Sequence, residues 1–260
     1  MSTMPASRIA AAARRRFGGE FEVPAGLPHL EALAALAERS VCRRYRGDPV
    51  PEALVRLLCA TALAAPTKSD LQQATIVRLA GAQRAAVCSL LPGSPWLAGA
   101  PELFIFCADG HRLRRLFARR GVAFPNEHLD AFFNATVDAA IALGAFVAAA
   151  ELAGLGTCPI SQVRDHVAKV DELLGLPDWV VPVAGLALGY PEAKEPLSAR
   201  LSLSATVHTG RYDLGAVERE LDAYDARRVR DWSGDKVQQY SKVMRGDFGE
   251  HVARKRFQLR

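Results

Sequence analysis

Residues 65–79, APTKSDLQQATIVRL, join the end of an apolar helix to a polar loop and then to a strand. The proline should end the helix, and the β-branched residues after the loop favour a strand. The loop between them carries four polar side chains, those of Thr67, Ser69, Asp70 and Gln72. Their hydroxyl, carboxylate and amide groups can hydrogen-bond a flat heterocycle that has both donors and acceptors. The same composition also fits a plain helix-to-strand turn, because Pro, Ser and Asp favour turns for local reasons.

Outward from this loop, the chain alternates helices with short apolar strands. The patterns predict helices over residues 29–38, 51–65, 82–91, 111–119 and 127–153, and strands over residues 75–79, 102–108 and 180–189. Residues 154–161 are glycine-rich and predict a helix cap followed by a turn, where backbone can approach a ligand closely. Strands separated by helices in this way indicate an α+β fold, with a mixed sheet covered by helices in three layers.

Two of these helices should supply much of the core. In the helix over residues 51–65, Leu54, Leu57, Leu58 and Leu63 are predicted to face inward. The helix over residues 127–153 is apolar around most of its circumference, so we expect it to be central. Its longest uncharged run is twelve residues, between Asp138 and Glu151, which is below the roughly 18 that suggest a bilayer span. The sequence therefore predicts a buried helix in a soluble protein, with no membrane partner.

Composition and charge narrow the functional classes. The chain has 260 residues, of which 50% are apolar and 23% charged, and this is ordinary for a soluble protein of one or two domains. The net charge of +5 is concentrated in arginine and lysine clusters at residues 14–16 and 254–256, near the two ends. We expect solvated ends, or arms that reach an anionic small molecule, and no nucleic-acid partner. Residues 1–18 lack acidic side chains, as transit peptides do, but a surface helix explains them as well.

The cysteines and short motifs exclude several other chemistries. Five cysteines without a CxxC pair, and six scattered histidines, support neither a disulfide framework nor a metal site. Reduced thiols in the cytoplasm are the simplest account, and no catalytic cysteine is predicted. The sequence also lacks a GxGxxG after a strand, a phosphate-binding GxxxxGK[ST] loop and a GxSxG nucleophile motif.

A set of short segments, in order and at matching spacing, resembles the nitroreductase family of FMN-dependent oxidoreductases. These segments are Arg39–Ser40 with Arg43 and Tyr45, Pro49–Pro51, Ala65–Thr67, Leu71–Gln72, Gly154–Thr157, Leu173–Pro177, Val181–Val183, Gly185–Pro191, Arg200–Leu201, Val207–His208 and Tyr212. The resemblance covers roughly residues 30–213. The long tail beyond it is similar to that of the larger NADPH-preferring branch.

The resemblance implies an architecture and an assembly. The fold would be a three-layer α-β-α arrangement with a mixed, mainly antiparallel sheet, a long central helix and a C-terminal extension. An N-terminal arm would span residues 1–28, the FMN-binding domain residues 29–213 and the extension residues 214–260. Two subunits of a cytoplasmic homodimer would share each cofactor.

The resemblance also implies the residues that hold FMN. Its phosphate would bind Arg39, Ser40 and Arg43, with Arg200 arriving from the distal end. The flavin and ribityl chain would face Thr67, Lys68, Ser69, Asp70 and Gln72 of the opposite subunit. The isoalloxazine would lie beside Pro159, Ile160 and Ser161. From the residues alone, the cations around Arg39 and Arg43 can hold a phosphate or form a solvated face.

Three positions depart from the family pattern. Relatives commonly space the two phosphate arginines three apart, whereas Arg39 and Arg43 are four apart. Asp70 stands where many relatives have Asn, so an ionised group that only accepts hydrogen bonds replaces an amide that also donates. Ser198 stands where the long-tailed branch often has Lys, which would place more of the phosphate binding on the two arginines.

The implied activity is an NAD(P)H oxidoreductase in which FMN accepts the hydride, so neither a catalytic side chain nor a metal is required. NADPH (or NADH) would reduce the flavin and leave, and a small electron-poor acceptor, such as a nitroaromatic or a quinone, would then take its place. Alternatives are a flavin reductase or reductive dehalogenase on the same scaffold, or a flavin-binding sensing protein without turnover. Within the tail, Arg227 and Arg228 are predicted to bind the extra phosphate of NADPH, or to belong to a charged helix that wraps the partner subunit.

Overall fold

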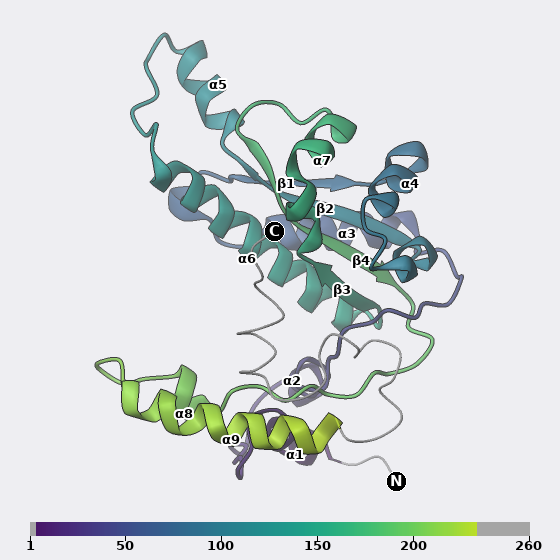
Figure 1. The fold of residues 1–260 in the computed structure, drawn as a ribbon, viewed down its shortest axis with the longest axis vertical. Coiled ribbons are helices and arrows are strands. Elements are labelled where there is room, and N and C mark those ends of the chain that lie inside the picture. Colours follow the sequence, from purple (N-terminus) through teal and green to yellow (C-terminus); the bar gives the residue numbers. More distant parts are fainter. Residues whose placement is uncertain (1–3, 233–260) are drawn as a thin grey trace. The chain divides into compact units, whose positions relative to one another are not determined.

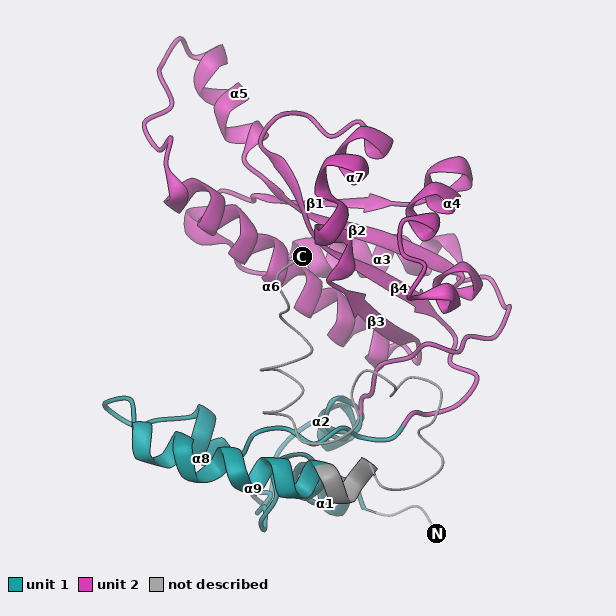
Figure 2. Cartoon of the chain, viewed as in Figure 1, with its two compact units in different colours: residues 1–38, 196–260 teal, residues 39–195 magenta. Residues whose placement is uncertain are grey.

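The computed structural model describes residues 4–232, and the chain divides into two compact units, one of residues 39–195 and one of residues 1–38 with 196–260 (Figure 2). The unit of residues 39–195 contains the sheet. Its elements are α3 (Glu52–Leu63), the 3-10 turn η1 (Lys68–Asp70), β1 (Ala74–Arg78), α4 (Gly81–Ser89), η2 (Pro95–Gly99), β2 (Glu102–Asp109), α5 (His111–Arg119), α6 (Leu129–Leu152), β3 (Gly156–Ile160), η3 (Gln162–His166), α7 (Val167–Leu174) and β4 (Val180–Gly189).

The four strands form one sheet in the order β1-β2-β4-β3, with every neighbouring pair antiparallel. Because β2 and β4 are central, β2 is buried along its whole length, as its apolar, aromatic sequence predicts. The strands β1 and β3 form the two edges. The described residues also contain a parallel bridge between Val41 and Thr157, beyond β3. The predicted α+β fold with a mainly antiparallel sheet is confirmed.

Helices cover both faces of the sheet, which makes three layers (Figure 1). On one face, α3 and α6 pack on alternate residues of β2, and the ring of Phe146 lies 5.2 Å from that of Phe104 and 5.7 Å from that of Phe106, centroid to centroid. On the other face, α4 and α7 cover Ile105 and Cys107. The alternation of side chains along a strand therefore divides β2 between two cores.

The predicted helices and strands are present, but the edge strand β3 was missed. Residues 154–161 contain the cap and turn at Gly154, which has a φ of +78°, but Gly156–Ile160 then form edge strand β3. The sequence pattern does not indicate this strand, because the strand is short and contains glycine and proline, which are depleted in strands. An edge position tolerates Pro159, since its missing N–H faces no neighbouring strand in the ladder.

The predicted burial of α3 and α6 was partly wrong. Leu57 and Leu63 of α3 are 61% and 50% exposed, and Phe133 of α6 is 63% exposed. Each helix turns one stripe toward the sheet, and a second apolar stripe stays exposed in the part of the chain that the structure describes. By length and composition alone, α6 is also apolar enough to cross a membrane. In the structure it packs against the sheet and α3, and it buries Asp138.

The other unit is helical, with α1 (Pro5–Phe17), α2 (Leu30–Ala37), α8 (Leu203–Thr206) and α9 (Leu214–Trp232). Arg8 of α1 pairs with Glu31 at 2.7 Å and with Glu38 at 2.8 Å, which links α1 to α2. A helix near the N-terminus is the surface helix expected for the Ala- and Arg-rich segment. The predicted bounds of residues 1–28, 29–213 and 214–260 remain a prediction, and residues 233–260 of the extension lie outside the described chain.

Replacing Gly156 with alanine should destabilise the fold at the β3 edge. A Cβ at this position would lie 2.6 Å from the Cβ and 2.8 Å from the Sγ of Cys42, so the segment beside β3 would have to move. We expect the free energy of unfolding to fall by about 1–3 kcal/mol, as for other overpacked sites. Urea denaturation measures it. Gly99→Ala is the matched control, because a Cβ there meets nothing within 4 Å. Equal stabilities of the two variants would contradict the packing described.

Candidate functional site

The segment from Arg39 to Tyr45 runs along the outer edge of β3. The amide N of Cys42 donates to the carbonyl O of Thr157 at 2.8 Å, and the Tyr45 hydroxyl donates to the carbonyl O of Cys42 at 2.6 Å. Cys42 is 4% exposed and packs against Gly156. Its side chain therefore anchors the segment between Arg39 and Arg43 to β3.

Arg39 and Arg43 flank this anchor on the same edge. The Nε of Arg39 lies 3.6 Å from Oε1 of Glu151, which also accepts a 2.8 Å hydrogen bond from the Thr157 hydroxyl. Burial raises the pKa of Glu151, and the Thr157 hydrogen bond and the charge of Arg39 oppose this rise. The guanidinium of Arg43 lies 5.9 Å from the centre of the Trp96 ring. Burial raises the pKa of the Cys158 thiol, and the nearby guanidinium of Arg43 partly opposes this rise.

The residues predicted to contact the isoalloxazine, Pro159, Ile160 and Ser161, lie at the end of β3 and directly after it. Pro159 and Ser161 are exposed, and Ile160 is buried in the core. Ser40 immediately precedes the bridge from Val41 to Thr157. The structure thus brings Arg39, Ser40 and Arg43 to the strand that carries Pro159, Ile160 and Ser161, although these two groups are far apart in the sequence.

The loop of residues 67–72 lies in front of the other edge strand, β1. Its backbone has positive φ angles at Ser69 (51°), Asp70 (56°) and Gln72 (53°), which are uncommon for residues other than glycine. Two side-chain hydrogen bonds support this loop conformation. The backbone N of Gln72 donates to the Thr67 hydroxyl oxygen at 3.2 Å, and the side-chain Nε2 of Gln72 donates to Asp70 Oδ1 at 3.2 Å. Backbone strain of this kind gathers at ligand sites. The exposed polar groups and strained backbone favour a binding loop over a plain turn.

A residue that the sequence reasoning missed fixes the loop. Asp138, in the middle of α6, is 1% exposed, and its two carboxylate oxygens accept from the backbone N–H groups of Lys68 and Gln73, each at 3.0 Å. The available signal was an acidic residue in the middle of a long apolar helix, away from the helix ends where Asp130 and Glu151 lie. Gln73 is also buried, and its Nε2 has no hydrogen-bond partner among the described residues.

A cavity of about 80 Å³ opens at this loop. Its lining includes Thr67 and Gln72 from the loop, Asp138 from α6 and Arg112 from α5. Arg112 donates from Nη2 to the carbonyl O of Ala74 at 2.5 Å and to the Thr75 hydroxyl at 3.1 Å. A cation therefore stands beside the polar loop.

The two groups of predicted residues lie at opposite edges of the sheet. The arginine group flanks β3, the loop precedes β1, and β2 and β4 lie between them. With a strand spacing near 4.8 Å, the edge strands are about 14 Å apart. Within one chain, the two groups therefore form two separate half-sites.

The other predicted cations belong to the unit of residues 1–38 and 196–260. Arg200 is exposed, its amide N donates to the carbonyl O of Arg16 at 2.6 Å, and its carbonyl accepts from Arg227 Nη2 at 2.8 Å. Arg228 is buried, at 3% exposure. The predicted roles of Arg200 in phosphate binding, and of Arg227 and Arg228 in NADPH binding, remain predictions.

The thiols are poor nucleophiles at neutral pH. All five cysteines are free, and burial raises the pKa of Cys42 to about 11 and that of Cys107 to about 12. A thiol reacts through its thiolate, so these groups are protonated and inert near pH 7. Among residues 4–232, no three His, Cys, Asp or Glu side chains are grouped so that they can hold a metal ion.

The geometry suits a ligand with a flat polar ring and an anionic end. Guanidinium groups and a hydroxyl at the β3 edge match a phosphate, since the fork of Arg pairs with phosphate oxygens and its charge is permanent. The strained loop offers donors and acceptors for the ring. The residues present in the two half-sites thus fit the two ends of a flavin mononucleotide.

Comparison with known proteins identifies relatives along most of the chain. The Nitroreductase family profile matches residues 36–190. The "FMN reductase [NAD(P)H]" of Bacillus subtilis is 28% identical over 252 residues, which cover 88% of this chain and 98% of that protein. The "Oxygen-insensitive NADPH nitroreductase" of Salmonella typhimurium is 30% identical over 87% of this chain and 90% of its own. The solved structure of the hypothetical oxidoreductase YcnD from Bacillus subtilis superimposes with a TM-score of 0.74 at 30% identity, covering 77% of this chain and 82% of that chain.

Proposed function

This chain belongs to the nitroreductase family, whose profile matches more than half of the chain, and we propose its function on that basis. The protein is an FMN-dependent NAD(P)H oxidoreductase that reduces small electron-poor acceptors. The observation that carries this conclusion is the similarity, over 87–88% of the chain, to relatives named as an FMN reductase and an NADPH nitroreductase. The two half-sites suited to FMN support it. When bound, FMN supplies the hydride-accepting ring.

The chain's own residues would bind and orient the cofactor. Arg39, Ser40 and Arg43 would hold the phosphate, joined by Arg200. Pro159, Ile160 and Ser161 would lie along the ring from the same edge. The loop residues Thr67, Lys68, Ser69, Asp70 and Gln72 would approach from the second half-site. The buried Asp138 is a positioning residue for this loop, because it holds the backbone on both sides of it.

A homodimer would complete each site. A single chain holds the half-sites at opposite edges of the sheet, so two copies related by a two-fold axis would pair the β3 edge of one with the loop of the other. The exposed apolar stripes on α3 and α6 supply the surface for such a pairing, with Leu57, Leu63, Leu129, Phe132, Phe133, Val137, Ile141 and Leu152 each at least 38% exposed. We place this soluble dimer in the cytoplasm.

The kinetic mechanism is ping-pong, since the electron donor and the acceptor would use the same place beside the flavin in turn. The acceptors are nitroaromatics and quinones, with free flavin as a second candidate because the Bacillus subtilis relative is named an FMN reductase. Reductive dehalogenation and a sensing role without turnover are the remaining alternatives, and no contact in the described chain favours either.

Anaerobic stopped-flow spectroscopy tests the proposal. The FMN-loaded protein should bleach on mixing with NADPH and should regain its colour when a nitroaromatic, a quinone or free FMN is added in a second mixing step. Bleaching without recovery by any of these acceptors would contradict the acceptor class. A flavin that NADPH and NADH both fail to bleach would instead identify a flavin-binding protein without turnover.

A further inference from the structure

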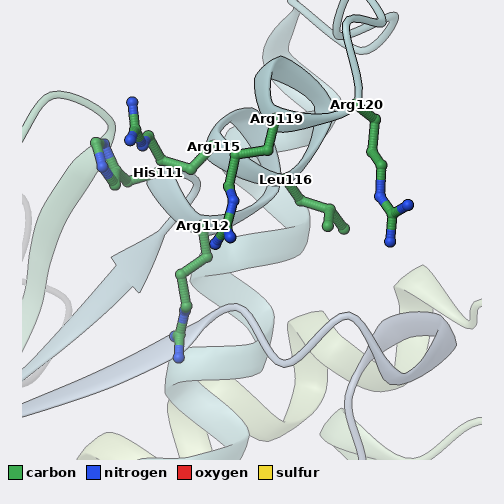
Figure 3. A pocket seen from close by; sticks show the side chains of 6 residues that line it. All are labelled: His111, Arg112, Arg115, Leu116, Arg119 and Arg120. Atoms are coloured by element: carbon green, nitrogen blue, oxygen red, sulfur yellow. The ribbon is translucent and has the colours of Figure 1, made fainter.

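We propose that α5 and the residue after it form the binding site for the 2′-phosphate of NADPH. This inference rests on the proposed function and adds the residues that would select the donor. The site is a hollow of about 590 Å³ lined by His111, Arg112, Arg115, Leu116, Arg119 and Arg120. Figure 3 shows these side chains, with Arg112 and Arg119 extending in the same general direction from the helix.

The hollow has a large uncompensated positive charge. Residues 110–126 contain five arginines and no acidic residue. Arg112 pairs with Asp109 at 3.2 Å and Arg114 pairs with Glu127 at 2.8 Å. The exposed Arg115, Arg119 and Arg120 have no ion-pair partner within residues 4–232. A solvated surface helix usually mixes both signs of charge, whereas an excess of guanidinium groups around one hollow suits a phosphate. In Figure 3, Arg112 and Arg119 extend downward from α5, and Arg115 extends toward His111.

The helix that carries these arginines is held firmly to the body of its unit. Both oxygens of Glu127 accept from Arg114, each at 2.8 Å. The guanidinium of Arg114 also lies 3.7 Å from the Trp179 ring centre and 4.5 Å from the Phe124 ring centre. One arginine of the helix is thus structural and keeps the others in place, which lowers the entropy cost of binding.

The hollow is next to the proposed flavin loop. Arg112 lines both the hollow and the cavity that Thr67 and Gln72 also line. A dinucleotide whose nicotinamide lies over a flavin held by this loop would therefore have its phosphates close to α5. The site would belong to the subunit that contributes the loop.

The arginines of α9 are less suited to this role. Arg228 is 3% exposed, and Arg227 donates to the carbonyl O of Arg200 and lies against Gly18. Both are built into their own unit. The experiment must therefore distinguish binding of the 2′-phosphate by α5 from binding by Arg227 and Arg228.

Titration calorimetry with adenosine 2′,5′-bisphosphate and adenosine 5′-monophosphate tests the proposal on the FMN-loaded protein. The wild-type protein should bind the bisphosphate about tenfold more tightly, the scale of one charge-assisted phosphate contact. Arg115→Ala and Arg119→Ala should each remove most of this difference and raise the KM for NADPH, with the KM for NADH nearly unchanged. Arg56→Ala, which removes an exposed arginine from α3, is the charge-matched control and should behave as wild type.

Each other outcome overturns the assignment. If the α5 variants retain the preference for the bisphosphate, or if only Arg227→Ala and Arg228→Ala lose it, then α5 is not the phosphate site. Tighter binding of a single-stranded oligonucleotide through the same arginines would identify a nucleic-acid surface instead. If neither dinucleotide bleaches the flavin, the proposed function is wrong, and the bisphosphate titration still decides whether α5 binds a 2′-phosphate.

Discussion

Arg43→Ala should weaken FMN binding by about 10- to 100-fold. The expectation follows from the loss of one charge-assisted contact to the phosphate, worth about 1.5–3 kcal/mol. Arg43 lies on the segment that Cys42 anchors to β3, beside Cys158 and Trp96, so the alanine variant keeps the anchor and removes only the cation. Fluorescence titration of the apoprotein with FMN measures the dissociation constant.

Two controls make this result specific to the phosphate. Riboflavin has the same ring and ribityl chain but no phosphate, so its affinity should not change in Arg43→Ala. The neighbouring Arg44 is exposed and pairs with Glu195 at 3.1 Å, so Arg44→Ala should bind FMN as wild type does. Equal loss of FMN and riboflavin, or equal effects of the two arginine variants, would show that Arg43 does not hold the phosphate.

Asp138→Ala should have the largest effect on stability. The substitution leaves the N–H groups of Lys68 and Gln73 without their acceptor, and each such loss costs about 1–3 kcal/mol when the group is buried. We expect the free energy of unfolding to fall by about 3 kcal/mol, and FMN binding to weaken because the loop loses its fixed shape. Urea denaturation of the apoprotein and flavin titration measure the two effects separately.

The neighbouring acidic residues of α6 provide the comparison. Asp130 is exposed in the first turn and, among residues 4–232, its carboxylate accepts hydrogen bonds from the side chains of Asn126 and Asn134 alone. Asp130→Ala should therefore change the free energy of unfolding by less than about 1 kcal/mol. Asp138→Asn keeps the shape and one acceptor, and should fall between the wild type and Asp138→Ala. If Asp138→Ala is as stable as Asp130→Ala, then Asp138 does not hold the backbone of the loop.

The parts of the fold that were predictable have strong local patterns. The short apolar run of β2 and the long apolar stretch of α6 each identify their element without tertiary information. The edge strand β3 was missed because Gly156 and Pro159 favour turns locally, while pairing with β4 and with the Cys42 segment overrides that preference.

The candidate site was only partly predictable for a similar reason. Polar residue types and a family resemblance marked Thr67–Gln72 and the Arg39–Arg43 segment. Neither revealed that Asp138, 65 residues beyond Gln73, binds the loop backbone. The outward stripes of α3 and α6 were also misread, because an apolar residue on an exposed helix face has the same sequence pattern as one that faces the core. Contacts between distant segments are the information that a single sequence lacks.

The most direct test of the central claim is the flavin content and mass of the purified protein, measured by chromophore release with mass spectrometry and by light scattering. We predict one FMN per chain in a particle of two chains, because each cofactor would contact the β3 edge of one copy and the loop of the other. A colourless protein that fails to take up added FMN would contradict the account, as would a monomer that retains FMN.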